Sequence, residues 1–216
     1  MTAEGTGRAT RLPREQRRQQ VLAAALEAFA ASGYHAASMD EIADLAGVSK
    51  PVLYQHFPGK LDLYLALLDA AVDHLLENAR TALSGTHDNR ERVRAMVDAY
   101  LDFVEDPSGA FRLLFESDLG NEPAVRQRVD AASEQLTRMG AAVIATDTGL
   151  SDAQAQLLAS GLHGMVQFAS VHWVRQAGHA TPISRAEAAD LLASLAWRGI
   201  GGFPLTHPPQ DGSPHA

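Results

Sequence analysis

The chain has 216 residues, of which 46% are hydrophobic and 20% charged, and it carries a formal net charge of -8. This length suits a small module joined to a larger one, and the sequence lacks an apolar run near the ~20 residues of a membrane span. It contains no cysteine, which excludes disulfides and thiolate sites, and its polar N-terminus lacks a secretory apolar stretch, so we expect a cytoplasmic protein.

The charge is divided unevenly along the chain. From Arg8 to Lys60 there are seven basic and five acidic residues, a balance of +2; beyond Lys60 there are 11 basic and 20 acidic residues, a balance of -9. A basic head on an acidic body suits a protein that touches polyanionic DNA with one end only. An ordinary solvated surface is the alternative explanation.

Apolar residues recur at spacings of three and four along most of the chain, and no stretch alternates as a half-buried strand would. The sequence therefore predicts an all-α fold. Prolines, glycines and capping boxes such as Ser151-x-x-Gln154 mark the helix ends. We expect helices at about 13–32, 38–46, 50–56, 60–84, 90–105, 108–119, 122–146, 152–177 and 185–198.

The second and third of these helices, joined by a glycine-containing turn at 47–49, form a helix-turn-helix, whose second helix enters the major groove of DNA. We expect Ser49 to cap that helix, with Pro51 in the first turn, where its missing N–H costs nothing. Val52 and Leu53 are expected to point inward. The side chains left for phosphates and base edges are Lys50, Tyr54 and Gln55.

The run Gly33-Tyr-His-Ala-Ala-Ser-Met-Asp-Glu-Ile-Ala-Asp-Leu-Ala-Gly-Val-Ser-Lys-Pro-Val-Leu-Tyr-Gln-His-Phe57, followed by Lys60, resembles the DNA-binding signature of the TetR family. The resemblance extends from about Arg14 to Leu65. It implies about nine helices, a homodimer made by a four-helix bundle of the last two helices, and a ligand cavity in the body. Gly59 and Pro51 depart from the residues that are usual in the family.

Pattern and resemblance together divide the chain into four parts. Residues 1–12 are expected to form a flexible basic arm, 13–60 the helix-turn-helix domain, 61–201 a ligand-binding and dimerisation domain, and 202–216 a flexible tail. We expect double-stranded DNA with a palindromic operator to be a partner, because a two-fold dimer demands it. The expected DNA-binding residues are Arg11, Arg14, Arg17, Ser38, Met39, Ser49, Lys50, Pro51, Tyr54, Gln55, His56 and Lys60.

Further segments, among them Arg11-Leu-Pro-Arg14, Thr86-x-Asp-Asn-Arg90 and Phe111-Arg-Leu-Leu-Phe-Glu116, are similar to the actinobacterial fatty-acid-synthesis regulators of this family. This resemblance implies an activator of fatty-acid synthase genes whose DNA binding is relieved by long-chain acyl-CoA. The alternative is a repressor of a transporter or catabolic operon that another hydrophobic small molecule releases.

The body carries many large apolar side chains at inward-facing spacings, and apolar stripes of this kind are the normal content of a helical core. Where aromatic residues pack imperfectly, they leave room for an apolar ligand. The residues expected to bind such a ligand are Leu75, Leu83, Val97, Tyr100, Phe103, Val104, Phe111, Leu114, Phe115 and Phe168.

The last two helices have long apolar faces, which favours dimerisation through them. The residues expected at the dimer interface are Leu158, Leu162, Met165, Leu191, Leu195 and Trp197.

Two rival classes remain. Against an enzyme, the sequence has no phosphate loop, nucleophile elbow or paired-histidine metal motif, and His163 and His172 lie about 180° apart on one helix, so we expect no catalytic residue, metal or cofactor. The second rival is a helical interaction module whose basic N-terminal stretch binds an acidic partner or a membrane surface. The helix bearing Lys50, Tyr54 and Gln55 argues against that module.

Overall fold

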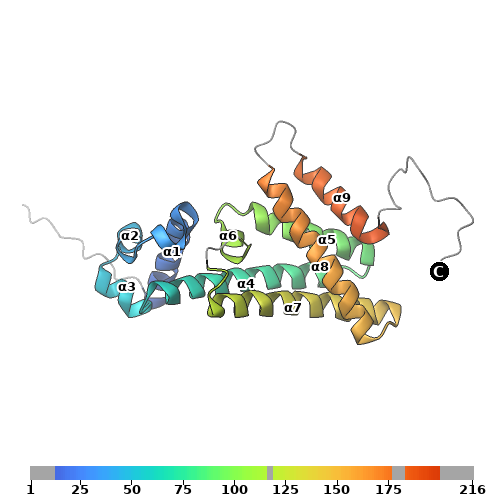
Figure 1. The fold of residues 1–216 in the computed structure, drawn as a ribbon, viewed down its shortest axis with the longest axis horizontal. Helices are drawn as coiled ribbons and strands as arrows, with labels where there is room; N and C mark the ends of the chain where they lie inside the picture. Colours follow the sequence, from blue (N-terminus) through green and yellow to red (C-terminus); the bar gives the residue numbers. More distant parts are fainter. Residues whose placement is uncertain (1–12, 116–118, 177–182, 200–216) are drawn as a thin grey trace, which may run out of the picture. The chain divides into compact units, whose positions relative to one another are not determined.

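The computed structural model describes residues 13–115, 119–176 and 183–199, which form nine α-helices and no strand (Figure 1). The all-α prediction is confirmed. In chain order the helices are α1 (Arg14–Ala36), α2 (Met39–Leu45), α3 (Lys50–His56), α4 (Lys60–Ser84), α5 (Asn89–Glu105), α6 (Ala110–Phe115), α7 (Pro123–Thr148), α8 (Asp152–Arg175) and α9 (Arg185–Arg198).

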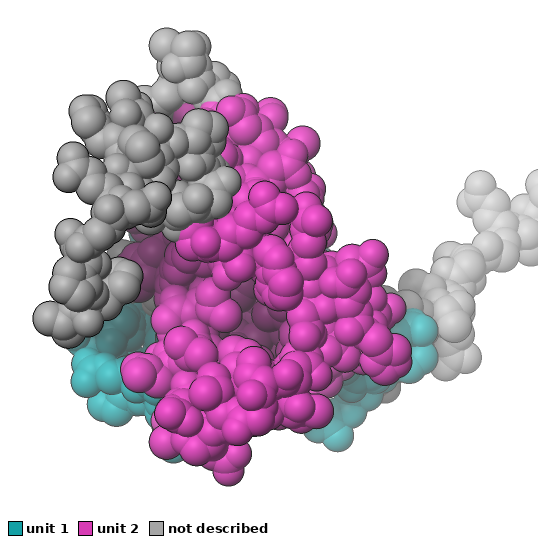
Figure 2. All heavy atoms as spheres, turned by 90° about the vertical axis from the view of Figure 1, so that its right-hand side faces the viewer, with its two compact units in different colours: residues 1–73, 106–130 teal, residues 74–105, 131–216 magenta. Residues whose placement is uncertain are grey.

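The helices belong to two compact units, coloured teal and magenta in Figure 2. Unit 1 comprises residues 1–73 and 106–130, and unit 2 comprises residues 74–105 and 131–216. Both α4 and α7 contribute residues to each unit. The functional division at residue 60 expected from the sequence is a different kind of boundary and stays a prediction.

Unit 1 is built around α1. Its buried face, which includes Val21, Ala25 and Phe29, packs against α2 and α6. The Phe29 ring lies edge-on to Tyr64 of α4, with 5.4 Å between the ring centroids, and the Tyr64 hydroxyl donates a hydrogen bond to the Leu113 carbonyl of α6 over 3.1 Å. These contacts join the N-terminal helices to the first half of α4 and to α6.

Two helices of unit 1 differ from their predicted bounds, α1 at its end and α6 at its start. The backbone of α1 breaks at Gly33, where φ is 78° and ψ is 168°, but helical turns resume as far as Ala36. The break itself was expected, because glycine adopts positive φ without strain. Helix α6 begins only at Ala110, since Ser108 and Gly109, the latter with φ of 75°, form a turn before it.

Unit 2 is held together by α5, which packs on both α8 and α9. In addition to the apolar contacts of its buried side, α5 forms ion pairs with α9. The Arg185 guanidinium of α9 lies 2.9 Å from Asp98 and 3.3 Å from Glu105, and it also pairs with Asp102. We call these four residues the Arg185 clasp.

No helix among the described residues combines the length and the hydropathy that a membrane span requires. Within the same ranges, no group of three or more histidine, aspartate or glutamate side chains could hold a metal ion.

Candidate DNA-binding surface and effector site

The helix-turn-helix is assembled by local capping and a single glycine turn. The Ser38 hydroxyl accepts a hydrogen bond from the Glu41 amide over 3.1 Å, and the Glu41 carboxylate accepts one from the Ser38 amide over 3.4 Å. This capping box starts α2, as predicted. Gly47, with φ of 61°, then turns the chain toward α3.

Helix α3 has a buried side and an exposed side. Leu53 is completely buried and Phe57, at the end of the helix, is 2% exposed, whereas Tyr54 is 48% exposed. Lys50 and Gln55 are exposed as well, and Val52 is half-buried. The inward orientation predicted for Leu53 is confirmed, and the side chains predicted to face DNA lie on the accessible surface.

Ser49 precedes α3, but its side chain does not cap the helix as expected. An N-cap hydroxyl normally accepts from the second or third amide of its helix. The second residue here is Pro51, which has no N–H, and the third amide, that of Val52, donates to the Ser49 carbonyl over 2.9 Å. Neither position therefore offers an N–H to the Ser49 hydroxyl, which makes no cap hydrogen bond.

Lys50 forms an exposed ion pair. Its ammonium lies 2.6 Å from the carboxylate of Asp40 on α2, and this hydrogen bond raises the pKa of Lys50 above its ordinary value. The cation predicted to meet phosphates thus has an acidic neighbour inside the motif. A DNA phosphate would compete with Asp40 for it.

Lys60 is engaged with the backbone of the segment around the Gly33 break. Its ammonium donates to the carbonyls of Tyr34, His35 and Ala37 over 2.8, 3.4 and 2.9 Å, and it lies 4.5 Å from the centre of the Tyr34 ring. The last carbonyls of a helix have no intrahelical donor, and by binding them the lysine ties the end of α1 to the start of α4. Its predicted contact with phosphate stays a prediction.

The remaining predicted DNA-binding residues surround these positions. Arg14, Ser38 and Pro51 are exposed, and Arg11 lies outside the described residues. The half-buried members of the set are Arg17, Met39 and His56. Sequence reasoning missed Arg18, whose guanidinium lies 4.5 Å from the centre of the Phe57 ring, because a cation–π contact across the fold leaves no spacing pattern.

Most residues predicted to bind a ligand are buried, which a core residue would be as well. Seven of the predicted ligand residues belong to unit 2: Leu75, Leu83, Val97, Tyr100, Phe103, Val104 and Phe168. Phe111, Leu114 and Phe115 belong to α6 of unit 1. Their role in ligand binding stays a prediction.

The prediction for Phe168 is wrong in placing its side chain inside the body. Phe168 is 78% exposed. Its neighbours on α8, Val166 and Ser170, are both buried, and a residue two positions from each points to the opposite side of a helix. Phe168 therefore lies on the outer face of α8.

That outer face of α8 also carries residues predicted to form a dimer interface. Leu158 is 49% exposed, and on α9 Leu191 and Trp197 are 40% and 47% exposed. Leu162, Met165 and Leu195 are half-buried. These side chains are accessible in the single chain, as an interface would require.

One polar contact lies among the apolar residues of unit 2. The Tyr100 hydroxyl of α5 is 3.2 Å from the His163 Nε2 of α8, and the same nitrogen is 2.9 Å from the Gln167 Oε1. Tyr100 is 2% exposed. No sequence pattern pairs Tyr100 with His163, because the two residues lie 63 positions apart and a lone histidine on a helix has no characteristic spacing.

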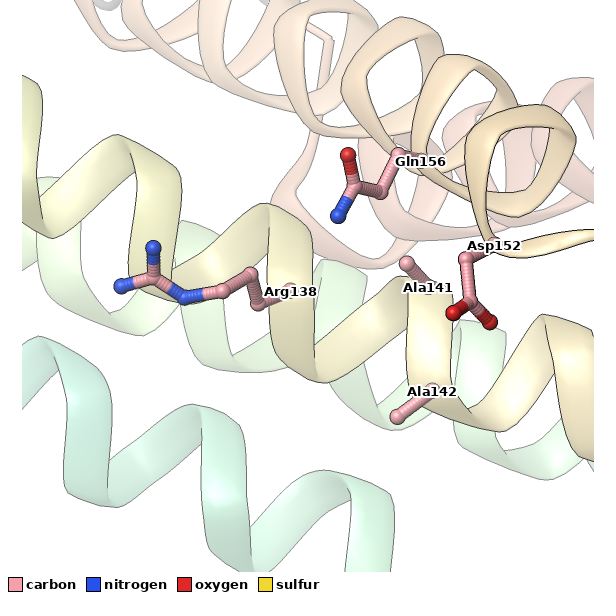
Figure 3. A pocket seen from close by; sticks show the side chains of 5 residues that line it. All are labelled: Arg138, Ala141, Ala142, Asp152 and Gln156. Carbon is pink, nitrogen blue, oxygen red and sulfur yellow. The ribbon is translucent and has the colours of Figure 1, made fainter.

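A cavity between α7 and α8 has a volume of about 230 Å³ and is lined by Arg138, Ala141, Ala142, Asp152 and Gln156 (Figure 3). None of these residues belongs to the predicted ligand set. Its volume falls below the roughly 300–1,000 Å³ of typical small-molecule sites. We therefore do not assign the effector to it.

Comparison with known families gives two matches. Residues 21–67 match the family described as bacterial regulatory proteins, tetR family, and residues 89–199 match the tetracyclin repressor-like C-terminal domain. The chain is 46% identical over 204 residues to the HTH-type transcriptional activator FasR of Mycolicibacterium smegmatis, an alignment that covers 94% of this chain and 92% of that protein. An uncharacterized HTH-type transcriptional regulator of Mycobacterium tuberculosis is 30% identical over 197 residues, covering 87% and 79%.

Solved structures of regulators share the fold of this chain. A TetR-like transcriptional regulator from Rhodococcus sp. RHA1 superposes with a TM-score of 0.71 and 32% identity, covering 89% of this chain and all of that one. The fatty acid degradation regulator FadR from Bacillus halodurans has a TM-score of 0.69, covers 85% of this chain and 96% of its own, and at 18% identity bears on the fold alone.

Proposed function

Because this chain belongs to the TetR family of bacterial regulatory proteins and is a DNA-binding transcriptional regulator, we propose that it activates fatty-acid synthase genes and that long-chain acyl-CoA relieves its DNA binding. Its families and relatives are regulators, not enzymes. The observation that carries the proposal is the 46% identity to an activator over nearly the whole chain. We expect it to act in the cytoplasm.

The DNA-binding part of the proposal is supported by the exposed side of α3. Tyr54 offers a hydroxyl to phosphate, and the Gln55 carboxamide can pair with adenine in the major groove. The ion pair of Lys50 leaves its charge at the surface. Phosphate contacts would set register, and Gln55 would supply discrimination of about 1 to 3 kcal/mol at one base pair.

A mobility shift on fragments from upstream of fatty-acid synthase genes tests this part. Random competitor DNA is added at two salt concentrations, because electrostatic association disappears with salt while specific binding survives. The expected result is a complex that persists on the operator fragment alone. Equal loss on operator and random fragments would contradict sequence-specific recognition.

The effector part rests on the apolar residues of unit 2. Val97, Tyr100 and Phe103 of α5 are buried, and we propose that the acyl chain lies among such side chains. Each buried methylene contributes about 0.8 kcal/mol, so affinity should climb with chain length until the space is filled. A hundredfold preference for the conformation that does not bind DNA would contribute about 2.7 kcal/mol per site.

DNA dissociation titrated with acyl-CoAs of increasing length tests the effector. Long chains should release the operator, and free CoA should not. Tyr100→Ala enlarges the proposed space and Leu83→Phe obstructs it, so both should blunt release while leaving ligand-free DNA binding intact. If no chain length releases the operator, the effector is another molecule and the transporter or catabolic repressor becomes the better reading.

We also propose that the protein is a homodimer through the outer face of α8 and through α9. Besides Phe168 and Leu158, this face carries Gly161 and Gly164, and an added Cβ at either glycine would meet no atom within 4 Å. Large apolar side chains beside small residues let two helices approach closely. A two-fold dimer then requires an operator with half-sites one helical turn, or a multiple, apart.

Sedimentation measures the dimer directly. Leu191→Asp places a charge in the proposed interface and should yield monomers or unstable protein, whereas Leu157→Ser, a milder change on a side chain that is 73% exposed, should preserve the fold and weaken association. A wild-type monomer that binds the operator would end the dimer proposal.

A further inference from the structure

The first two turns of α1 carry three arginines on the side of the helix that is buried further along. Arg14, Arg17 and Arg18 lie three and four residues apart, so they share one face of α1. Val21 and Leu22, the next residues on this face, are buried in the core of unit 1. The arginines therefore continue the core-facing side of α1 beyond the edge of the core. We call them the α1 arginine row.

Arg18 lies at the end of α3. Its guanidinium is 4.5 Å from the centre of the Phe57 ring, and Phe57 is the residue that directly follows α3. Because Phe57 is only 2% exposed, its ring is fixed by the core and holds the guanidinium in one place. A stacked guanidinium keeps its N–H donors, which lie in the plane of the group. Arg18 is thus oriented by Phe57 while its donors remain available to a ligand.

The positive charge of the α1 arginine row is not neutralised within the part of the chain that the structure describes. There, no ion pair joins the row to a carboxylate. Glu15, which lies beside the row, accepts a hydrogen bond from Gln19 over 3.1 Å. By contrast, Arg128 elsewhere in unit 1 lies 2.6 Å from the Asp69 carboxylate. Cations without acidic partners on one side of a small domain favour the binding of a polyanion.

The dimensions of DNA bring its backbone close to Arg18 when α3 occupies the major groove. The groove is about 12 Å wide and a helix with its side chains is about 10–12 Å across, so phosphates line both sides of a docked helix. Helix α3 has seven residues and is about 10 Å long, so its end is never far from these phosphates. The Phe57 ring is buried, so the guanidinium above it lies beside α3 and not on the exposed side that bears Tyr54. This position suits a contact with the backbone and not with the base edges.

We propose that Arg18, stacked on Phe57, binds a DNA phosphate at the rim of the major groove that α3 enters. A guanidinium matches the geometry of a phosphate, because two of its N–H groups can donate to two phosphate oxygens. The other arginines of the row add positive charge next to the same backbone strand. A phosphate contact positions the protein without reading sequence, so Arg18 contributes equally at all sites. The inference concerns the DNA-binding activity and does not depend on the identity of the effector.

Neutralised phosphates test this contact. A duplex that the full-length wild-type protein selects from a random library is prepared in versions that each carry one methylphosphonate, which removes the charge of one phosphate. On the unmodified duplex, Arg18→Gln should weaken binding about tenfold, as expected for the loss of a charged hydrogen bond. The wild-type protein should lose affinity at the methylphosphonate that replaces the phosphate bound by Arg18. Arg18→Gln should lose no further affinity there, because a lost contact cannot be lost twice.

Two matched variants separate this contact from a general effect of charge. Arg80→Gln removes the same charge from α4, where the guanidinium is already paired with Glu77 over 3.1 Å, and should leave DNA affinity unchanged. Arg18→Lys keeps the charge but loses the planar group, so it should recover only part of the affinity. The slope of log affinity against log salt should fall by about 0.9 per lost contact in Arg18→Gln and should stay unchanged in Arg80→Gln.

Three results would overturn the proposal. If Arg18→Gln binds the unmodified duplex as tightly as the wild-type protein does, Arg18 makes no contact with DNA. If Arg18→Gln binds more weakly but remains as sensitive as the wild-type protein to every methylphosphonate, Arg18 does not bind a phosphate. A lower melting temperature with an unchanged salt slope would show that the stacking of Arg18 on Phe57 serves the fold alone.

Discussion

The α2–α3 region and the α5–α8 region place their polar groups in opposite ways. In the first, the interior is apolar, the polar residues face outward, and the capping box joins residues three positions apart. In the second, a tyrosine and a serine are buried and the tyrosine's partner lies 63 positions away. The helix-turn-helix can be built from contacts that are local in the chain, whereas the buried polar contact of unit 2 depends on packing between distant helices.

Substitutions on the buried and exposed sides of α3 should have very different effects on stability. Leu53→Ala removes a completely buried side chain and should lower the free energy of unfolding by about 2–5 kcal/mol, because a cavity remains. Tyr54→Ala on the exposed side should change it by less than about 0.5 kcal/mol yet weaken operator binding. Denaturant unfolding followed by a mobility shift measures both. Equal destabilisation would mean that Tyr54 belongs to the core.

Lys60 tests whether a cation near the DNA-binding surface serves the fold. Lys60→Met keeps the alkyl stem but leaves the carbonyls of Tyr34 and Ala37 without their donor, and should cost about 1.5–3 kcal/mol of unfolding free energy. Lys50→Met, on an exposed side chain, is the matched control and should cost little. Unaltered stability with reduced DNA affinity would instead make Lys60 a phosphate contact.

The buried contact between Tyr100 and His163 should make the stability of unit 2 depend on pH. The folded-state pKa of His163 lies below its ordinary value of 6.5, so the unfolded state binds the proton first as the pH falls. The stability tied to neutral His163 is present above pH 6.5 and is lost as the pH falls from there toward the lowered pKa. His163→Gln should flatten this decline in melting temperature, measured between about pH 7.5 and 5.5. Parallel curves for the two proteins would argue against the shift.

The smallest expected effect concerns the exposed ion pair. Lys50→Ala should reduce the slope of log affinity against log salt by about 0.9 if the ammonium meets one phosphate. Asp40→Asn removes the competing carboxylate and should strengthen binding to all sequences alike. An unaltered slope in Lys50→Ala would remove this lysine from the interface.

What could be predicted from the sequence follows the same divide. The start of α1 after Pro13, the capping boxes at Ser38 and Ser151, and the buried Leu53 depend on residues close in the chain, and all were predicted correctly. The predicted side-chain cap by Ser49 is wrong although it too is local, because Pro51 has no N–H to donate to the Ser49 hydroxyl. The prediction for Phe168 is wrong because apolar character alone does not determine which side of α8 a residue occupies.

Contacts across long sequence separations could not be predicted. Lys60 donates to carbonyls 23 to 26 residues earlier in the chain. Gly33 predicts that the helix is interrupted near these carbonyls, but it does not indicate which side chain will donate to them. Tyr100 meets His163 only once α5 and α8 are packed. Periodicity identifies the face of each helix but not the partner residue on the next helix.

The Arg185 clasp constrains the order in which this protein can change during evolution. One guanidinium serves Asp98, Asp102 and Glu105. Replacing Arg185 first would take this cation from all three acids, of which Asp98 alone would keep an ion pair with Arg94 on the preceding turn of α5. Losing a carboxylate first leaves the arginine with partners. When related proteins lose the clasp, replacement of the acids on α5 by neutral residues should therefore precede replacement of Arg185. Sequences that lack Arg185 but retain all three acids should be rare.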